Sequence, residues 1–137
     1  MTPKGAKNAV VQRYLDEFLG DFPIALSNQP FSKPEPAAGV RWVRLDVRLV
    51  SGGQDTLGAP GQRKFVSSGV ATVQVFTPSG DATDINDDLA KASLDLLDGV
   101  RIGTDLWTDG GRILTVGTDG EWYQQNVAIN VHFEETR

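Results

Sequence analysis

The sequence contains no cysteine, one histidine and one methionine among its 137 residues. Without cysteine the chain can form no disulfide, thiolate nucleophile or cysteine-ligated metal centre, and this composition fits a protein made in a reducing compartment. The chain also lacks a run of about 18 apolar residues, which a membrane-spanning helix would need. Its first residues include neither the apolar core nor the small-residue cleavage site of a secretory signal. We therefore expect a soluble protein made in a cytoplasm.

Charge and length limit the function further. The net charge is −5, which argues against non-specific binding to nucleic acid, because the phosphate backbone attracts positively charged surfaces. A chain of 137 residues is one domain of ordinary size and can bury a core without disulfides. No internal repeat or domain boundary is evident, so we expect a single domain over residues 1–137.

Motifs of common enzyme classes are absent from the sequence. There is no P-loop and no Gly-x-Ser-x-Gly nucleophile elbow. His132 lies on the polar side of a predicted strand near Glu134 and Glu135; a general base is conceivable, but an exposed strand histidine is the favoured interpretation. The acidic run 81–88 lacks the ligand spacing and central glycine of a calcium loop. We expect no enzymatic activity, no cofactor and no metal.

Two segments show helical periodicity. From Val10 to Leu19 the apolar residues recur three and four positions apart, and Gly20 then ends the helix. A second helix is predicted over roughly Thr83 to Asp98, with a side-chain cap from Thr83 or Asp84 and acidic residues in its first turn. The expected apolar stripe of this second helix consists of Ile85, Leu89, Ala92, Leu96 and Leu97.

Alternating patterns predict the strands. Between Val40 and Val50, apolar residues alternate with Arg44, Asp46 and Arg48, so one face should be buried and the other charged. Lys64 to Phe76 is the next predicted strand. The expected elements after the second helix are a short strand, a loop around "GTDLW", a strand at Arg112 to Thr118, a turn at Gly117 to Trp122 and a closing strand at Trp122 to Phe133.

The order of these elements favours hairpins over crossover connections. We therefore predict an α+β fold, with a largely antiparallel sheet of four to five strands and both helices packed on one face. The residues expected to form its core are Leu45, Val47, Val73, Val75, Leu89, Leu96, Ile129 and Val131.

A long connection separates the first two predicted strands. Ser51 to Gly61 is rich in glycine, proline and polar residues, and Gly69 in the following strand is a candidate β-bulge. Loops beyond roughly 12–15 residues are uncommon in compact domains and are usually functional or disordered. Because this loop holds no catalytic residues, we expect it to be mobile in an isolated subunit and to contact another protein.

The charged strand face and the long loop are the candidate interaction surfaces. Arg41, Arg44 and Arg48 with Trp42 could form a nucleic-acid patch, but interleaved acids and the negative net charge favour a solvated sheet face or a protein interface. The candidate protein-interface residues are Arg41, Trp42, Arg44, Asp46, Arg48, Gln54, Asp55, Arg63 and Lys64.

The order of segments resembles the tail terminator proteins of phages with long, non-contractile tails. After an amphipathic N-terminal helix, the family's extended segment P-x-A-x-x-N-x-x-F-x-P is matched by residues 23–34, and its first long strand by "RWVRLDVRLV". The next strand and the closing strand match through Arg63, Gly69, Val73 and Val75, and through Trp122, Val127, Ile129, Val131 and Phe133. Asp81-Ala82 departs from the family at the entry to the second helix, where a glycine is usual.

The resemblance implies a hexameric ring at the head-proximal end of the tail. Such a ring stops polymerisation of the tube protein and offers a docking surface for the head. The implied partners are copies of the chain itself, the tail tube protein and a head-side connector, with no small-molecule substrate and no membrane. DNA would pass through the ring without specific binding, and the chain would reach the virion from the host cytoplasm. Two alternatives remain: another connector or tail-completion ring protein, and a small acid–base enzyme that uses His132.

Overall fold

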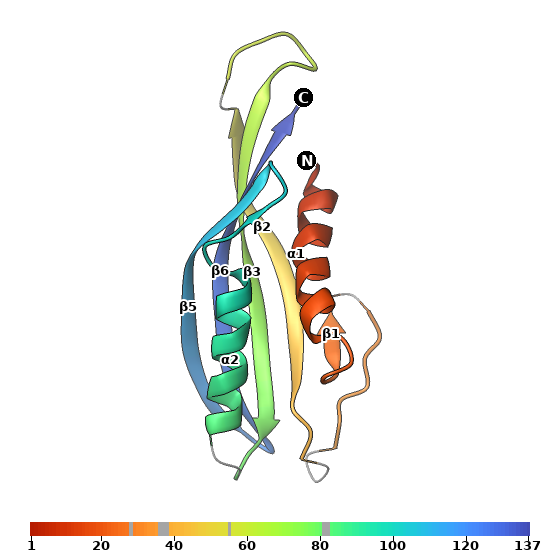
Figure 1. The fold of residues 1–137 in the computed structure, drawn as a ribbon, viewed down its shortest axis with the longest axis vertical. Helices are drawn as coiled ribbons and strands as arrows, with labels where there is room; N and C mark the ends of the chain where they lie inside the picture. The colour runs from red at the N-terminus through yellow and green to blue at the C-terminus, as the bar shows by residue number, and fades with distance from the viewer. Residues whose placement is uncertain (28, 36–38, 55, 81–82) are drawn as a thin grey trace.

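The computed structural model describes residues 1–27, 29–35, 39–54, 56–80 and 83–137. It has the predicted α+β architecture, with a curled sheet and two helices among these residues (Figure 1). In chain order the elements are α1 (Pro3–Phe18), β1 (Ile24–Leu26), β2 (Trp42–Gln54), β3 (Lys64–Pro78), α2 (Asp84–Leu97), β4 (Arg101–Ile102), β5 (Leu106–Asp119) and β6 (Trp122–Thr136).

The sheet is larger than predicted and is mixed. Its strand order is β1-β2-β3-β6-β5-β4, with β1 parallel to β2 and every other pairing antiparallel. The prediction of a largely antiparallel sheet of four to five strands is therefore wrong in strand number, and it did not include the parallel pairing at one edge. The short strand predicted after the second helix is β4. The strand that was not predicted is β1, whose three residues are too few for an alternating pattern to be recognised in the sequence.

Both helices pack on the same face of the sheet, as predicted (Figure 1). The inward-facing residues of β2, β3 and β6 meet α1 and α2 in one apolar cluster. Of the predicted core residues, Leu96 is only partly buried against this cluster. The other predicted core residues are buried: Leu45, Val47, Val73, Val75, Leu89, Ile129 and Val131.

Helix α1 starts earlier than its apolar stripe suggested. Proline at the first helical position and the Thr2 hydroxyl, which accepts the Gly5 N–H at 3.0 Å, begin the helix at Pro3. The helix buries Ala6 on its first turns, whereas Leu19, predicted as part of the stripe, is 71% exposed. Leu19 is the residue after the last helical one and has an extended backbone, which turns its side chain away from the core.

Helix α2 buries only part of its predicted apolar stripe, since Leu89 and Leu97 are buried and Leu96 partly so. Ile85 is 51% exposed and Ala92 is exposed, while Asn86 and Ser93 are fully buried. The Asn86 amide donates to the carbonyl oxygens of Val75 and Tyr123 and to the hydroxyl of Thr77. The predicted side-chain cap from Thr83 is not formed. Asp81 and Ala82 lie outside the described residues.

The other buried polar residue of α2 connects the two helices. The Ser93 hydroxyl lies 3.0 Å from the phenol oxygen of Tyr14 on α1. Burial raises the pKa of Tyr14 to about 12, although the hydrogen bond with Ser93 acts to lower it. The phenol is therefore neutral at physiological pH and joins the helices by an uncharged hydrogen bond.

The β2–β3 hairpin is longer than predicted and projects beyond both helices (Figure 1). Residues 51–54, predicted as loop, pair with residues 65–68, so the connection runs only from 55 to 63. The register shifts between Leu49 and Ser51, which makes Val50 the extra residue of a bulge opposite Gly69. A Cβ atom at Gly69 would overlap the carbonyl oxygen of Arg48, so this close strand approach requires glycine.

Strand β5 also extends beyond its prediction. It begins at Leu106, so part of the expected "GTDLW" loop belongs to the strand. The register with β6 shifts between Asp109 and Arg112, where Gly110 has φ 63° and forms part of a second bulge. The closing hairpin turns at Gly120 and Glu121, with Asp119 paired to Trp122, close to the predicted position.

Candidate functional site

The face of the sheet opposite the helices carries most of the polar strand side chains. We call it the open face, because neither described helix covers it. The predicted alternation on β2 is confirmed: Val43, Leu45 and Val47 are buried on the helix side, and Arg44 and Arg48 are exposed on the open face. Across the sheet, the open face also presents Thr72 and Gln74 of β3, Asn126, Asn130 and His132 of β6, and Asp109, Arg112 and Leu114 of β5.

One end of the open face is aromatic. Trp42 stacks on Phe76 with ring centroids 4.1 Å apart and on Phe31 at 5.2 Å, while Trp122 approaches its edge at 5.9 Å. The Arg44 guanidinium lies 5.7 Å from the Trp42 ring. Trp42, a predicted interface residue, is only 2% exposed. Because Phe31, Phe76 and Trp122 surround its ring, Trp42 offers almost no contact surface of its own.

Arg41 lies apart from the other candidate residues of β2. Its guanidinium stands 5.4 Å from the ring of Phe22, on the helix side of the molecule. There it lines a groove of about 350 Å³ together with Phe18, Asp21 and Asp88. The structure therefore does not group Arg41 with Arg44 and Arg48.

The tip of the β2–β3 hairpin holds a third group of candidates. Gln54 is the last residue of β2 and donates from its side chain to the Thr56 carbonyl oxygen at 2.7 Å. Lys64 is exposed, and Arg63 pairs through its backbone with the C-terminal residue, Arg137. Along β2, this tip is about 33 Å from Arg44 at the usual rise per strand residue. Asp55 lies outside the described residues.

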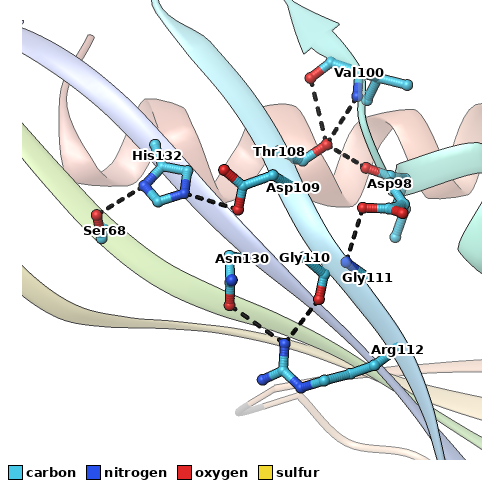
Figure 2. Close-up of polar contacts among 11 residues, drawn as sticks. Ser68, Asp98, Val100, Thr108, Asp109, Gly110, Gly111, Arg112, Asn130 and His132 are labelled. Carbon is cyan, nitrogen blue, oxygen red and sulfur yellow. Dashed lines mark hydrogen bonds and ion pairs between the residues drawn. The ribbon is translucent and has the colours of Figure 1, made fainter.

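His132 joins three strands on the open face (Figure 2). Its Nδ1 lies 2.9 Å from the Ser68 hydroxyl on β3, and its Nε2 lies 3.1 Å from the Asp109 carboxylate on β5. The imidazole ring stacks on Trp107 at 5.7 Å between centroids. The predicted acidic neighbours, Glu134 and Glu135, are not its hydrogen-bond partners. The hydrogen bond from His132 lowers the pKa of Asp109.

A chain of hydrogen bonds from Ser68 through His132 to Asp109 suggests nucleophilic catalysis. The described residues around it do not supply the oxyanion donors that such catalysis needs. Acyl transfer needs backbone or side-chain donors aimed at a developing oxyanion. Ser68 and His132 are paired residues of two central strands, whose backbone N–H groups lie in the plane of the sheet and bond to neighbouring strands. Among the described residues the arrangement matches a cross-strand polar contact on an antiparallel sheet.

The outer part of β5 is a feature that the sequence analysis did not identify as a surface. The end of α2 anchors the beginning of β5, since the Asp98 carboxylate accepts the Gly111 N–H at 2.9 Å (Figure 2). Beyond this point the strand is exposed on both faces, and Ile113, Leu114 and Val116 are 37%, 51% and 53% exposed. The available signal was "ILTV", in which the apolar residues Ile113, Leu114 and Val116 fall on both faces of the strand, whereas in a strand with one buried face apolar residues alternate with polar ones.

The described residues include no group of three or more histidine or acidic side chains that could bind a metal ion. Asp84 and Asp87 of the acidic run lie in the first turn of α2, as the helix-capping interpretation predicted. No described helix is both long and apolar enough to cross a membrane.

Comparison with known proteins adds evidence on the fold alone. No protein-family profile and no curated protein matches the chain. A solved structure of a protein without a descriptive name is similar over 95% of this chain and 97% of its own, with a TM-score of 0.61 and 19% sequence identity. At this identity the likeness shows a shared fold and does not extend to activity or partners.

Proposed function

We propose that this chain is a structural subunit of a phage tail that caps the head-proximal end of the tail tube, stops its polymerisation and provides a docking surface for the head. The family resemblance of the sequence supplies this function. The structural observation that best supports an assembly role is the amount of sheet left unpartnered in the described subunit, which comprises the open face, the outer part of β5 and the projecting hairpin. Exposed sheet edges are sites of pairing with another chain.

An enzyme is the less favoured reading of the same surface. Its case rests on His132 with Ser68 and Asp109, and we found no oxyanion donors around them in the described part of the chain. The side-chain exposures of His132 and Asp109 are 24% and 58%, so water would screen the polar interactions on which such chemistry depends.

The decisive experiment removes the chain from the phage or prophage that encodes it and restores it from a plasmid. We expect lysates without the chain to contain tails of uncontrolled length and separate, DNA-filled heads in electron micrographs. Complementation with the natural chain or with His132→Ala should restore joined particles. A chain that acts as an enzyme through His132 would fail in the second complementation.

Two other outcomes would change the proposal. Tails of normal length that do not join heads would indicate the alternative role, a connector or completion ring on the head side. Normal particles without the chain would contradict both structural roles.

A further inference from the structure

The tip of the β2–β3 hairpin exposes an apolar side chain. Leu57 is 94% exposed, more than any other large hydrophobic residue described, and the tip projects beyond both helices (Figure 1). Two hydrogen bonds close the loop behind it. The Thr56 N–H donates to the Lys64 carbonyl oxygen, and the Lys64 N–H donates to the Thr56 hydroxyl. The apolar core of the subunit does not include Leu57, so its exposure serves no packing purpose within one copy.

Two basic residues flank Leu57. Lys64 is exposed and lies opposite Thr56, while the side chain of Arg63 lies beside Gly58. Among the described residues, neither Arg63 nor Lys64 forms an ion pair. The tip therefore presents an apolar side chain with two cations next to it.

A groove of complementary character lies on the helix side of the molecule, between the end of α1 and the first half of α2. It has a volume of about 350 Å³, enough to hold a leucine side chain. Its apolar residues include Ile85 and Ala92, the two members of the predicted α2 stripe that the subunit leaves exposed. The other apolar residues that line it are Phe18, Phe22 and Leu89.

Acidic side chains border this groove. Asp21 and Asp88 line it, and Asp84 and Asp87 lie in the same first turn of α2. In the part of the chain that the structure describes, Asp21 and Asp88 form no ion pair. Arg41 is the one cation among the lining residues, and its guanidinium lies against the Phe22 ring. The groove therefore suits an apolar side chain that has positive charge beside it.

The tip of one copy is too far from its own groove to occupy it. β3 runs from Lys64 at the tip to Val75, whose carbonyl oxygen accepts the Asn86 amide at the start of α2. At the usual rise per strand residue, this separation is about 35 Å. The two surfaces can therefore meet only between copies. Such a contact joins different surfaces of two identical chains, and its repetition gives a ring if the rotation closes.

We propose that the hairpin tip of one copy docks in the α1–α2 groove of another, with Leu57 against the apolar lining and Lys64 facing Asp21 and Asp88. Burial of Leu57 together with Ile85 favours the contact, and the opposite charges around them orient it. This inference deepens the proposed function, on which it rests for the choice of a second copy as the partner.

The absence of natural cysteine allows a direct test. Ala59→Cys, at the tip, and Ala92→Cys, in the groove, place thiols at exposed positions and leave Leu57 unchanged. The two variants are mixed in equal amounts and treated with a short bifunctional maleimide. We expect a cross-linked dimer in the mixture and little in either variant alone. A mixture of Ala59→Cys with Asn8→Cys, an exposed position of α1 outside the groove, is the matched control.

Replacing the exposed leucine tests its role in solution. Leu57→Ser should weaken self-association by about tenfold to hundredfold, measured by sedimentation over a range of concentrations, because a buried leucine is lost from the contact. Val50→Ser removes another exposed apolar side chain from the same hairpin, away from the tip, and should leave association unchanged. Circular dichroism checks that both variants are folded.

Charge exchange tests the orientation of the contact. Lys64→Glu and Asp88→Lys should each weaken self-association by about tenfold, because each brings like charges together across the contact. The variant with both changes should regain most of the loss, since every tip then meets a groove of opposite charge. Two losses that add in the double variant would contradict the proposed facing of these residues.

The outcomes separate this inference from the proposed function. A ring-sized assembly that is insensitive to Leu57→Ser, with no specific cross-link, would overturn the tip contact and leave the capping function standing. A monomer that gives no cross-link at any concentration would also overturn it, as would cross-linking of the tip to the tail tube protein alone. Specific cross-linking in a dimer that grows no further would support the contact and count against a ring closed through it.

Discussion

The buried amide of Asn86 gives a sharp test of the packing between α2 and the sheet. It is 0% exposed and donates to Val75 O at 3.2 Å, Thr77 Oγ1 at 3.1 Å and Tyr123 O at 3.2 Å. Asn86→Ala removes the amide that donates to these three oxygens. It leaves them without this hydrogen-bond partner and opens a small cavity where the amide lay. An unsatisfied buried polar group costs about 1–3 kcal/mol. We expect the free energy of unfolding to fall by about 2–3 kcal/mol.

Thermal and urea unfolding followed by circular dichroism will measure this loss. For a domain of this size, about 4 °C of midpoint temperature corresponds to 1 kcal/mol, so the midpoint should fall by about 8–12 °C. Asn8→Ala makes the same change at an exposed position of α1 and serves as the control. A loss in Asn86→Ala no larger than in Asn8→Ala would refute the inward orientation of this face of α2.

Asn86→Asp sharpens the argument through pH. The aspartate has nearly the same shape but places a buried carboxylate against the carbonyl oxygens of Val75 and Tyr123, which disfavours its charged form and raises its folded pKa above the usual value of about 3.9. The folded state then binds a proton more tightly than the unfolded state. The variant should therefore be least destabilised below about pH 4 and progressively worse as pH rises to its folded pKa. A deficit that does not depend on pH would contradict this environment.

Three further predictions concern the core and the open face. Ile129→Ala, at a fully buried position of β6, should cost about 2–5 kcal/mol in urea unfolding; a loss near zero would mean that the β6 register is shifted by one residue. The His132 hydrogen bond lowers the pKa of Asp109, so this contact should stabilise the fold above the unfolded pKa of about 3.9. The stabilisation should be lost as pH falls through the lower folded pKa. The difference in unfolding midpoint between the natural chain and Asp109→Asn should therefore shrink over that range. Reversing Arg44 and Arg48 to glutamate should leave the unfolding midpoint nearly unchanged, since isolated surface charges contribute at most about 1 kcal/mol, but should give tails of uncontrolled length in electron micrographs; normal tails would remove this part of the open face from the interface.

Much of the fold could be predicted from local patterns. The alternation of apolar residues with Arg44, Asp46 and Arg48 correctly assigned the two faces of β2, and Ile129 and Val131 did the same for β6. These predictions succeeded because each strand has one face on the core. Apolar and polar residues then alternate along its sequence, since successive side chains point to opposite faces.

The candidate site was less predictable. Of the proposed interface residues, Arg44, Asp46 and Arg48 share the open face, but Trp42 is buried and Arg41 lies on the helix side. Both outcomes depend on neighbours far along the chain or across the sheet, such as Phe76 over Trp42. Whether the surface is an interface remains a prediction.

Polar residues in the core illustrate a second limit. The hydrophobic pattern of α2 correctly predicted the burial of Leu89 and Leu97 but also pointed to Ile85 and Ala92, which are exposed. The polar residues Asn86 and Ser93 are buried instead of these two. Their burial is favourable only because β3, β6 and α1 supply hydrogen-bond partners at the required positions. A helix considered alone contains no information about those partners.

The sequence by itself determined the α+β class, the two helices and the alternating long strands, because helix and strand periodicities are local properties of the chain. Only the tertiary structure decided which strands became neighbours, and therefore where β1 and β4 stop and leave β2 and β5 open. An open edge is defined by the absence of a neighbour, and pairing depends on residues that are far apart in the sequence. For the same reason the groove that brings Asp21 beside Ile85 and Asp88 appears only once both helices are packed on the sheet.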